Sequence, residues 1–245
     1  MGLPSVRAKN LWTDEQLMLA FHLYCQLPFG KLHSGNPEII ALAKLIGRTP
    51  SAVAMKLVNF ASLDPAITKS GRRGLSNASA ADKKIWEEFN SDWEGLDTQC
   101  NELLSDLGSS PALDEGLDVS LDDVPADYVG QVRVASVNIR VKQSFFRRAV
   151  LASYGGRCCM SGVSTSELVV ASHIVPWAKD EKNRLNPHNG LCLSAIHDRA
   201  FDRGLITVTP DLKVRVAEEV KQHSEDGKLS LLLASLGGVD KFIDG

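Results

Sequence analysis

The sequence predicts an α+β protein with two domains: a helical, winged-helix-like domain over residues 1–95 and a domain of strands and helices over residues 128–245. Three observations predict this division. The first part carries repeated helix start and stop signals, and the second part alternates β-rich runs with helical ones. Residues 96–127 between them are acidic and poor in aromatic residues, so they predict a linker that buries little surface.

Capping signals define the helices of the first domain. Thr13 and Gln16 form a capping box, and Asn36 and Thr49 each precede a proline that can stand at the first helical position. Gly47 is placed to end the second helix. The expected helices run from Thr13 to about residue 26, over 37–46, over 50–60 and over about 80–93.

Two of these helices, over 38–46 and 51–60, look like a helix-turn-helix whose second member would lie in a DNA groove. The face of that second helix expected to be exposed comprises Ser51, Ala52, Lys56 and Asn59. Lys56 could reach guanine or phosphate, and Asn59 could pair with the edge of adenine. The same helices could also form a plain packing module, and the sequence leaves both interpretations open.

A short basic loop over residues 68–74 follows these helices and carries Arg72 and Arg73. Its place after the expected recognition helix suggests a wing on the adjacent DNA backbone. Both arginines are therefore candidate DNA contacts.

The charge of the chain is unevenly distributed. The net charge of −3 depends on residues 94–127, which hold ten acidic residues and no lysine or arginine; without them, 27 basic residues face 20 acidic ones. That acidic segment is interpreted as a spacer, or alternatively as a phosphate mimic that folds back on a basic groove. Residues 128–166 hold six basic residues and no acidic one, which favours contact with phosphates. The DNA contacts expected in the second domain are Arg147, Arg148, Arg199 and Arg203.

The second domain places ionisable residues at the ends of its expected elements. His173 ends a β-rich run, Asn189 follows sixteen residues later, and the pair His197 and Asp198 opens a short helix. Asp198 and Asp202 are four residues apart, so a helix presents them on one face. Each residue alone fits an ordinary strand end, turn or helix start. Their order and spacing together favour a functional site.

This arrangement resembles the site of the HNH endonuclease family, the ββα-metal nucleases, over roughly residues 145–210. The signature positions would fall on His173, Asn189 and the pair His197 and Asp198, with Pro-Trp after the first of them. The resemblance implies metal-dependent hydrolysis of phosphodiester bonds in double-stranded DNA, in a restriction or phage-defence setting. One such site cuts one strand, so a double-strand cut implies a homodimer or two sequential nicks.

The chemistry of phosphodiester hydrolysis suggests a role for each residue. A neutral histidine can take a proton from water, so His173 is the candidate general base, and Asn189 would position it. Asp198 and Asp202 would hold Mg²⁺, Mn²⁺ or another divalent ion, which neutralises the scissile phosphate. His197 is a candidate both as a catalytic phosphate contact and as a third metal ligand, and the sequence does not decide between them.

The chain departs from the family pattern in two places. Ser172 stands where many members carry Asp or His as a metal ligand. Many HNH proteins also frame the site with two zinc-binding Cys-x-x-Cys knuckles, whereas Cys159–Gly162 and Cys192–Ala195 each keep one cysteine, so structural zinc is not expected. These losses leave open a DNA-binding regulator with a decayed site. A repair or RNA-directed nuclease is a further alternative.

The remaining segments complete the expectation. Residues 205–208 and 213–217 are interpreted as a hairpin, and residues 229–236 as a short helix. Residues 11–93 are similar, less specifically, to the N-terminal domain that accompanies HNH modules in restriction-type endonucleases, some of which recognise modified bases. The chain has five cysteines, an odd number, and no run of eighteen apolar residues, which favours reduced thiols and a cytoplasmic location.

Overall fold

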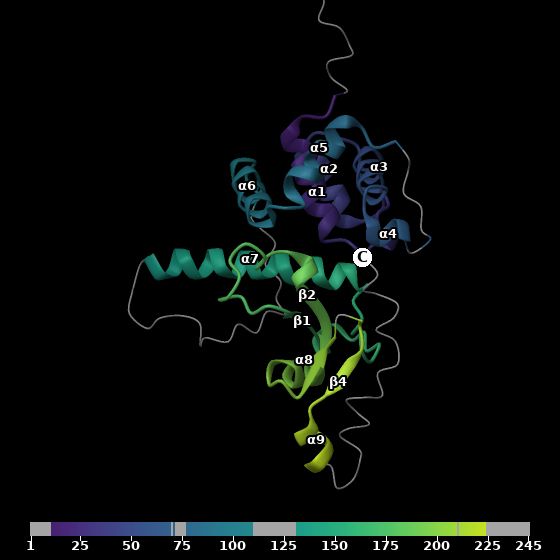
Figure 1. The fold of residues 1–245 in the computed structure, drawn as a ribbon. Coiled ribbons are helices and arrows are strands. Elements are labelled where there is room, and N and C mark those ends of the chain that lie inside the picture. Colours follow the sequence, from purple (N-terminus) through teal and green to yellow (C-terminus); the bar gives the residue numbers. More distant parts are fainter. Residues whose placement is uncertain (1–10, 70, 72–76, 110–130, 210, 224–245) are drawn as a thin grey trace, which may run out of the picture. The chain divides into compact units, whose positions relative to one another are not determined.

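A computed structural model shows two compact units, one within residues 1–24 and 30–111 and the other within residues 25–29 and 112–245 (Figure 1). The structure describes residues 11–69, 71, 77–109, 131–209 and 211–223. The units are described separately. In the described ranges, no helix combines the length and apolar character needed to cross a membrane.

The first unit is helical, and local signals set most of its helix ends. Its helices are α1 (Asp14–Cys25), α2 (Pro37–Leu45), α3 (Pro50–Ala61), α4 (Pro65–Lys69), α5 (Ala80–Phe89) and α6 (Trp93–Asp106). The capping box is confirmed, because Thr13 Oγ1 accepts a hydrogen bond from the Gln16 amide at 3.2 Å. Gly47 takes a positive φ of 68°, which lets the amide of Arg48 reach the carbonyl of Ala43 and end α2.

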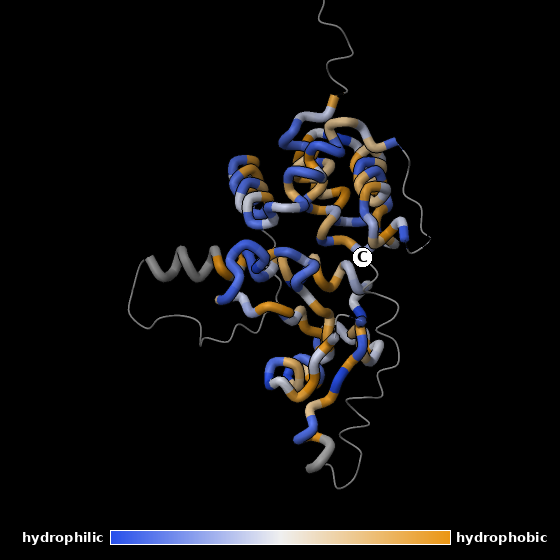
Figure 2. The backbone as a smooth tube through the Cα atoms, viewed as in Figure 1, coloured by the Kyte–Doolittle hydropathy of each residue, from blue (hydrophilic) through white to orange (hydrophobic). Residues whose placement is uncertain are grey.

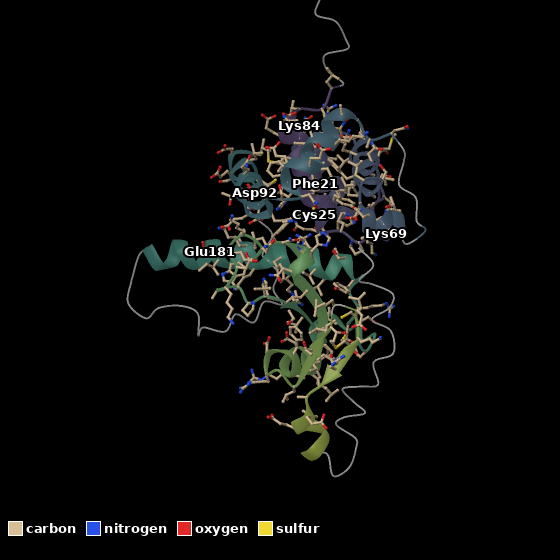
Figure 3. The ribbon with its side chains drawn as sticks, in the orientation of Figure 1. Phe21, Cys25, Lys69, Lys84, Asp92 and Glu181 are labelled. Carbon is tan, nitrogen blue, oxygen red and sulfur yellow. The ribbon has the colours of Figure 1, made fainter. Side chains whose placement is uncertain are left out.

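The core of the helical unit is built around aromatic rings. Phe21, labelled in Figure 3, is fully buried, with its ring centroid 5.1 Å from that of Phe60 and 5.4 Å from that of Trp86. Figure 2 shows hydrophobic and hydrophilic residues alternating along α3, as expected for a helix with one face on this core. Large apolar rings of this kind supply most of the burial that holds a small helical unit together.

The helical unit extends further along the chain than the sequence predicted. A single helix was expected over 80–93, with a linker from residue 96. Instead α5 ends at Phe89, and Asp92 caps a new helix, α6, by accepting a hydrogen bond from the Gly95 amide at 2.9 Å. Leu96 and Cys100 in α6 are fully buried. The expected boundary is wrong because the acidic composition concealed an apolar pair at helical spacing.

The wing expected after α3 is not seen. The described part of the helical unit contains no strand, and the chain after α3 forms the short helix α4. Arg72 and Arg73 lie outside the described residues. The helices α2 and α3 are present near the expected positions, whereas the winged form and its role remain predictions.

Lys56 is a clear correction to the expected DNA-facing surface of α3. Its side chain is 10% exposed, and its ammonium donates a hydrogen bond to the Asp82 carboxylate at 2.8 Å. Asp82 also accepts from the amide of Ser79 at the start of α5. The residues of α3 that are exposed are Ser51 and Met55. The turn of α3 that carries Lys56 faces α5, a contact between distant segments that helical periodicity cannot reveal.

The buried pair of Lys56 and Asp82 is expected to stabilise the helical unit. Lys56→Met leaves the Asp82 carboxylate buried without its cation, so the free energy of unfolding should fall by about 3–5 kcal/mol. Lys84→Met is the matched control, because Lys84 pairs with Asp14 in an ion pair whose side chains are about 60% exposed. Urea denaturation of both variants measures the difference. Equal free energies of unfolding for the two variants would show that the buried ion pair stabilises the unit no more than the exposed pair does.

The second unit confirms the α+β expectation. Its elements are α7 (Gln131–Ser153), β1 (Val169–His173), β2 (Gly190–Ser194), α8 (Ala195–Asp202), β3 (Ile206–Val208), β4 (Val214–Val216) and α9 (Glu218–His223). β1 and β2 are antiparallel, with His173 opposite Gly190. β3 and β4 form the expected antiparallel hairpin. The helix expected over 229–236 lies outside the described residues.

The long helix α7 lies against β1 and β2 (Figure 1). Phe146 and Val150 of α7 are buried, and a Cβ at Gly190 would overlap the side chains of both. Glycine is therefore required at the start of β2, where helix and strand approach closely. The guanidinium of Arg147 donates a hydrogen bond to the carbonyl of Val169 at 2.9 Å. Arg147 thus ties α7 to β1, whereas the sequence had suggested a phosphate contact.

Candidate functional site

His173 lies at the end of β1 with its tautomer determined by a backbone contact. Its Nε2 is 2.9 Å from the carbonyl oxygen of Arg184. A carbonyl can only accept a hydrogen bond, so Nε2 carries the proton and Nδ1 keeps its lone pair. The imidazole is therefore oriented by a backbone group and retains one basic nitrogen.

Aromatic neighbours hold the His173 ring in place. The ring stacks on Phe146 of α7, with centroids 3.7 Å apart and planes 8° apart, and it meets the edge of Trp177 at 5.6 Å. Burial lowers the pKa of His173, although the Arg184 carbonyl and the charge of Asp202 act in the opposite direction. The histidine is consequently neutral at neutral pH, the state that can accept a proton.

Asn189 connects the two segments on either side of the site. It is buried, and its Oδ1 accepts a hydrogen bond from the amide of Val175 at 2.8 Å, while its Nδ2 donates to the carbonyls of Val175 at 3.1 Å and Asn183 at 3.3 Å. Its own carbonyl accepts from the amide of Ile174. The side chain thus fastens the loop that follows His173.

The two carboxylates of α8 act on each other, and one of them acts on His173. Burial raises the pKa of Asp198, and the negative charge of Asp202 raises it further. The same Asp202 charge acts on His173. Ser172 lies beside Asp198 and lowers its pKa, yet the buried Ser172 hydroxyl makes no hydrogen bond of normal geometry to any described residue. These four side chains from β1 and α8 therefore share one site.

The donor set of this site fits a hard divalent cation. Two carboxylates one helical turn apart repel each other, and a cation between them would remove that repulsion. Within the described residues, no group of three or more His, Cys, Asp or Glu side chains could hold a metal by itself. Mg²⁺ commonly binds to one or two carboxylates and completes its shell with water and substrate phosphate, so a pair suffices.

His197 does not belong to this set, which corrects its assignment as a third ligand. The side chain is buried, and its Nδ1 lies 2.7 Å from Ser194 Oγ and 3.5 Å from Cys158 Sγ. Its Nε2 is buried and has no hydrogen-bond partner among the described residues. His197 therefore joins the start of α8 to the turn at Cys158, and Asp198 is the member of the pair that lies beside Ser172 and Asp202.

The contacts of the cysteines also differ from the sequence expectation. The knuckle remnants were placed at Cys159 and Cys192, but Cys158 is the cysteine that meets His197, whose Nδ1 also contacts Ser194. Burial alone would raise the pKa of Cys158, but hydrogen bonds from His197 and Ser161 outweigh it and lower that pKa to about 6. Burial raises the pKa of Cys159 and of Cys192 to about 12. Hydrogen bonds and apolar packing thus connect these segments.

The remaining arginines differ in their access to solvent. Arg199 of α8 and Arg203 directly after α8 are exposed beside the carboxylates, as a phosphate contact requires, while Arg148 of α7 is only partly exposed. No sequence signal indicated that the Arg184 carbonyl and the Phe146 ring would surround His173. Phe146 belongs to α7, outside the β1–β2–α8 unit, and Arg184 acts through its backbone carbonyl, which residue type does not reveal.

The β1–β2–α8 unit thus carries a histidine at a strand end and two carboxylates on the following helix. Residues 158–209 match the family described as HNH endonuclease. The matched stretch contains both strands, α8 and every residue of the site except Phe146. This match supports a hydrolase of the nuclease type acting on DNA. A comparison with curated proteins finds no match.

The pKa of His173 leads to a pH prediction for any reaction that uses it as a base. Because burial lowers this pKa below the ordinary value of 6.5, the basic form persists below that pH. Activity should therefore stay constant as pH falls to about 6.5 and decline only at lower pH. A cation at Asp202 would shift the decline in the same direction. The pH profile of kcat/KM measures this decline. A decline centred above pH 7 would contradict the lowered pKa of His173.

Proposed function

We propose that the chain is a metal-dependent endonuclease that hydrolyses phosphodiester bonds of double-stranded DNA. The observation that supports it most is that two kinds of group share this site. One is His173, whose Nδ1 keeps its lone pair, and the other is the carboxylate pair Asp198 and Asp202 on α8. Hydrolysis of a phosphodiester needs a general base next to a site that binds a divalent cation.

Each group of the site has a step in this proposal. His173 Nδ1 removes a proton from a water molecule, whose oxygen attacks the phosphorus while the bond to the 3′ oxygen breaks. Asp198 and Asp202 would hold the divalent ion, which supplies positive charge for the phosphate and the departing oxygen. Asn189 keeps the loop after the base in place. The departing 3′ oxygen takes a proton from solvent, and the neutral histidine is restored when its own proton passes to solvent.

A cleavage assay on the full chain tests this function. Supercoiled plasmid, DNA with methylated or hydroxymethylated cytosine, and RNA are each incubated with Mg²⁺, Mn²⁺ or a chelator. The proposal expects nicked or linear DNA with metal and intact DNA with chelator. Cleavage of RNA alone would favour the RNA-directed alternative. Tight DNA binding without cleavage under every metal would favour the regulator with a decayed site.

We also propose that the helical unit binds the DNA substrate, in a restriction or phage-defence role that includes modified bases. The support is the succession of α2 and α3, joined by a short turn at Gly47, with Ser51 and Met55 exposed on α3. Asn59 on the same helix is partly exposed, although its Oδ1 is buried and has no hydrogen-bond partner among the described residues. A base edge could reach Asn59 only through the exposed part of its side chain.

Asn59→Ala in the full chain should then reduce discrimination between preferred and random duplexes by about 1–3 kcal/mol. The physical reason is the loss of a paired base contact. Filter binding at two salt concentrations measures it, because loss of a phosphate contact would instead weaken all sequences equally and reduce the salt dependence. Unchanged discrimination would make the helical unit a packing or protein-interaction module.

A further inference from the structure

Three consecutive apolar residues are exposed directly after His173. Ile174 is 45% exposed, Val175 is 39% exposed, and Pro176 is also exposed. A surface loop normally carries polar residues, and a run of exposed apolar residues costs solubility unless it has a function. The run has no part in the hydrolysis steps derived above, so its position beside the base calls for another explanation.

The run is held rigidly relative to the base. The amide of Ile174 donates to the Asn189 carbonyl at 2.9 Å, and the amide of Val175 donates to Asn189 Oδ1 at 2.8 Å. The carbonyl of Val175 accepts from Asn189 Nδ2 at 3.1 Å, and Pro176 has a fixed φ. A loop fixed by three hydrogen bonds presents its side chains in one place, which a flexible apolar loop would not.

The chemistry of the run excludes phosphate as its contact. Both amides of Ile174 and Val175 are already bonded, and proline has no amide to donate. Its side chains can make favourable contact only with apolar surface. On DNA, such surface is offered by the deoxyriboses and by the faces of the bases.

We propose that Ile174–Pro176 forms an apolar wedge against the sugar and base faces of the nucleotides next to the scissile phosphate. Three residues span at most about 10 Å, so a phosphate at His173 keeps the run within about three base-pair steps. Isoleucine and proline are side chains that other proteins insert between base steps of the minor groove, where they unstack the bases and bend the duplex. The inference rests on the proposed function.

The wedge adds a source of specificity that requires no hydrogen bond to a base. Unstacking costs least at pyrimidine–purine steps and most in stiff A-tracts. Cleavage by the wild-type chain is therefore expected to favour deformable steps at the cut position. Single-stranded DNA is already unstacked, so the wedge should matter little there.

Cleavage by full-chain variants tests the wedge. Ile174→Ser combined with Val175→Ser should lower kcat/KM at least tenfold on a duplex and less than threefold on the same sequence as a single strand. Leu168→Ser is the matched control: Leu168 is 51% exposed just before the other end of β1, and its loss should leave both rates unchanged. Thermal melting establishes that each variant is folded.

A spectroscopic measurement separates the wedge from a general loss of binding. A duplex with 2-aminopurine beside the mapped cut position is bound by the His173→Ala chain, and its fluorescence should rise as the base unstacks. Adding the two serines should remove this rise at saturating protein. An unchanged rise, or equal loss of cleavage on duplex and single strand, would overturn the wedge.

Two further outcomes are distinguishable. A wild-type chain that cuts no nucleic acid overturns both the function and the wedge, whereas a cutting wild-type chain with equally active variants overturns the wedge alone. Size-exclusion chromatography with light scattering reports the mass of the assembly in solution. If the two serine substitutions lower that mass, the run contacts a second copy of the protein and the wedge is wrong.

Discussion

His173→Ala is expected to abolish DNA cleavage while the affinity for DNA stays within a few fold of the wild-type value. The imidazole accepts a proton in the transition state and contributes little to ground-state binding, so the loss appears in kcat. Loss of a positioned general base costs about 10²–10⁴-fold in rate. Single-turnover cleavage and filter binding of the same preparation measure the two quantities.

The matched control for that variant is His188→Ala. His188 is an exposed histidine of the same unit, just before β2. Its removal should leave the rate unchanged. Near wild-type cleavage by the His173→Ala chain would contradict the assignment of the base and with it the nuclease function.

Asp198→Asn and Asp202→Asn should each weaken the binding of divalent cations and lower the cleavage rate. Each variant removes one charge of the pair that attracts the cation, so the affinity should fall by at least the roughly 10–100-fold that the loss of an outer-sphere partner costs. Isothermal calorimetry with Mn²⁺ on the full chain measures the affinity, and excess Mn²⁺ should partly restore cleavage.

The control for the carboxylates is Asp211→Asn. Asp211 is an exposed aspartate paired with Lys213 in the turn between β3 and β4, so its loss should change neither quantity. If both α8 variants bind metal as tightly as the wild-type chain, the cation-binding site lies elsewhere. His197 would then need reconsideration, although its Nδ1 is engaged by Ser194.

The local structure of the chain was largely predictable. Capping residues, positive-φ glycines and helical spacing act over a few residues, so Thr13, Asn36 and Gly47 marked helix ends that the structure shows. The order of His173, Asn189 and Asp198 likewise predicted a strand, a second strand and a helix. The error in predicting a linker where α6 lies also has a local cause. Composition averaged over a segment hides the few positions that are buried.

The pairing of distant side chains was not predictable. The partner of Lys56 is 26 residues away, and the carbonyl that orients His173 belongs to a loop eleven residues further on. Helical periodicity gave no reason to bury a lysine. A buried ion pair appears only when two helices meet.

Short-range signals in the chain specify which residue types are available for hydrolysis and on which short elements they lie, because hydrogen bonds along the backbone and turn chemistry are local. Which of these residues meet depends on tertiary packing. Packing placed His197 against Cys158 and Asp198 beside Ser172, because adjacent residues on a helix point about 100° apart and only packing selects the face. It also left Ile174–Pro176 exposed beside the base, since burial is a property of the assembled unit.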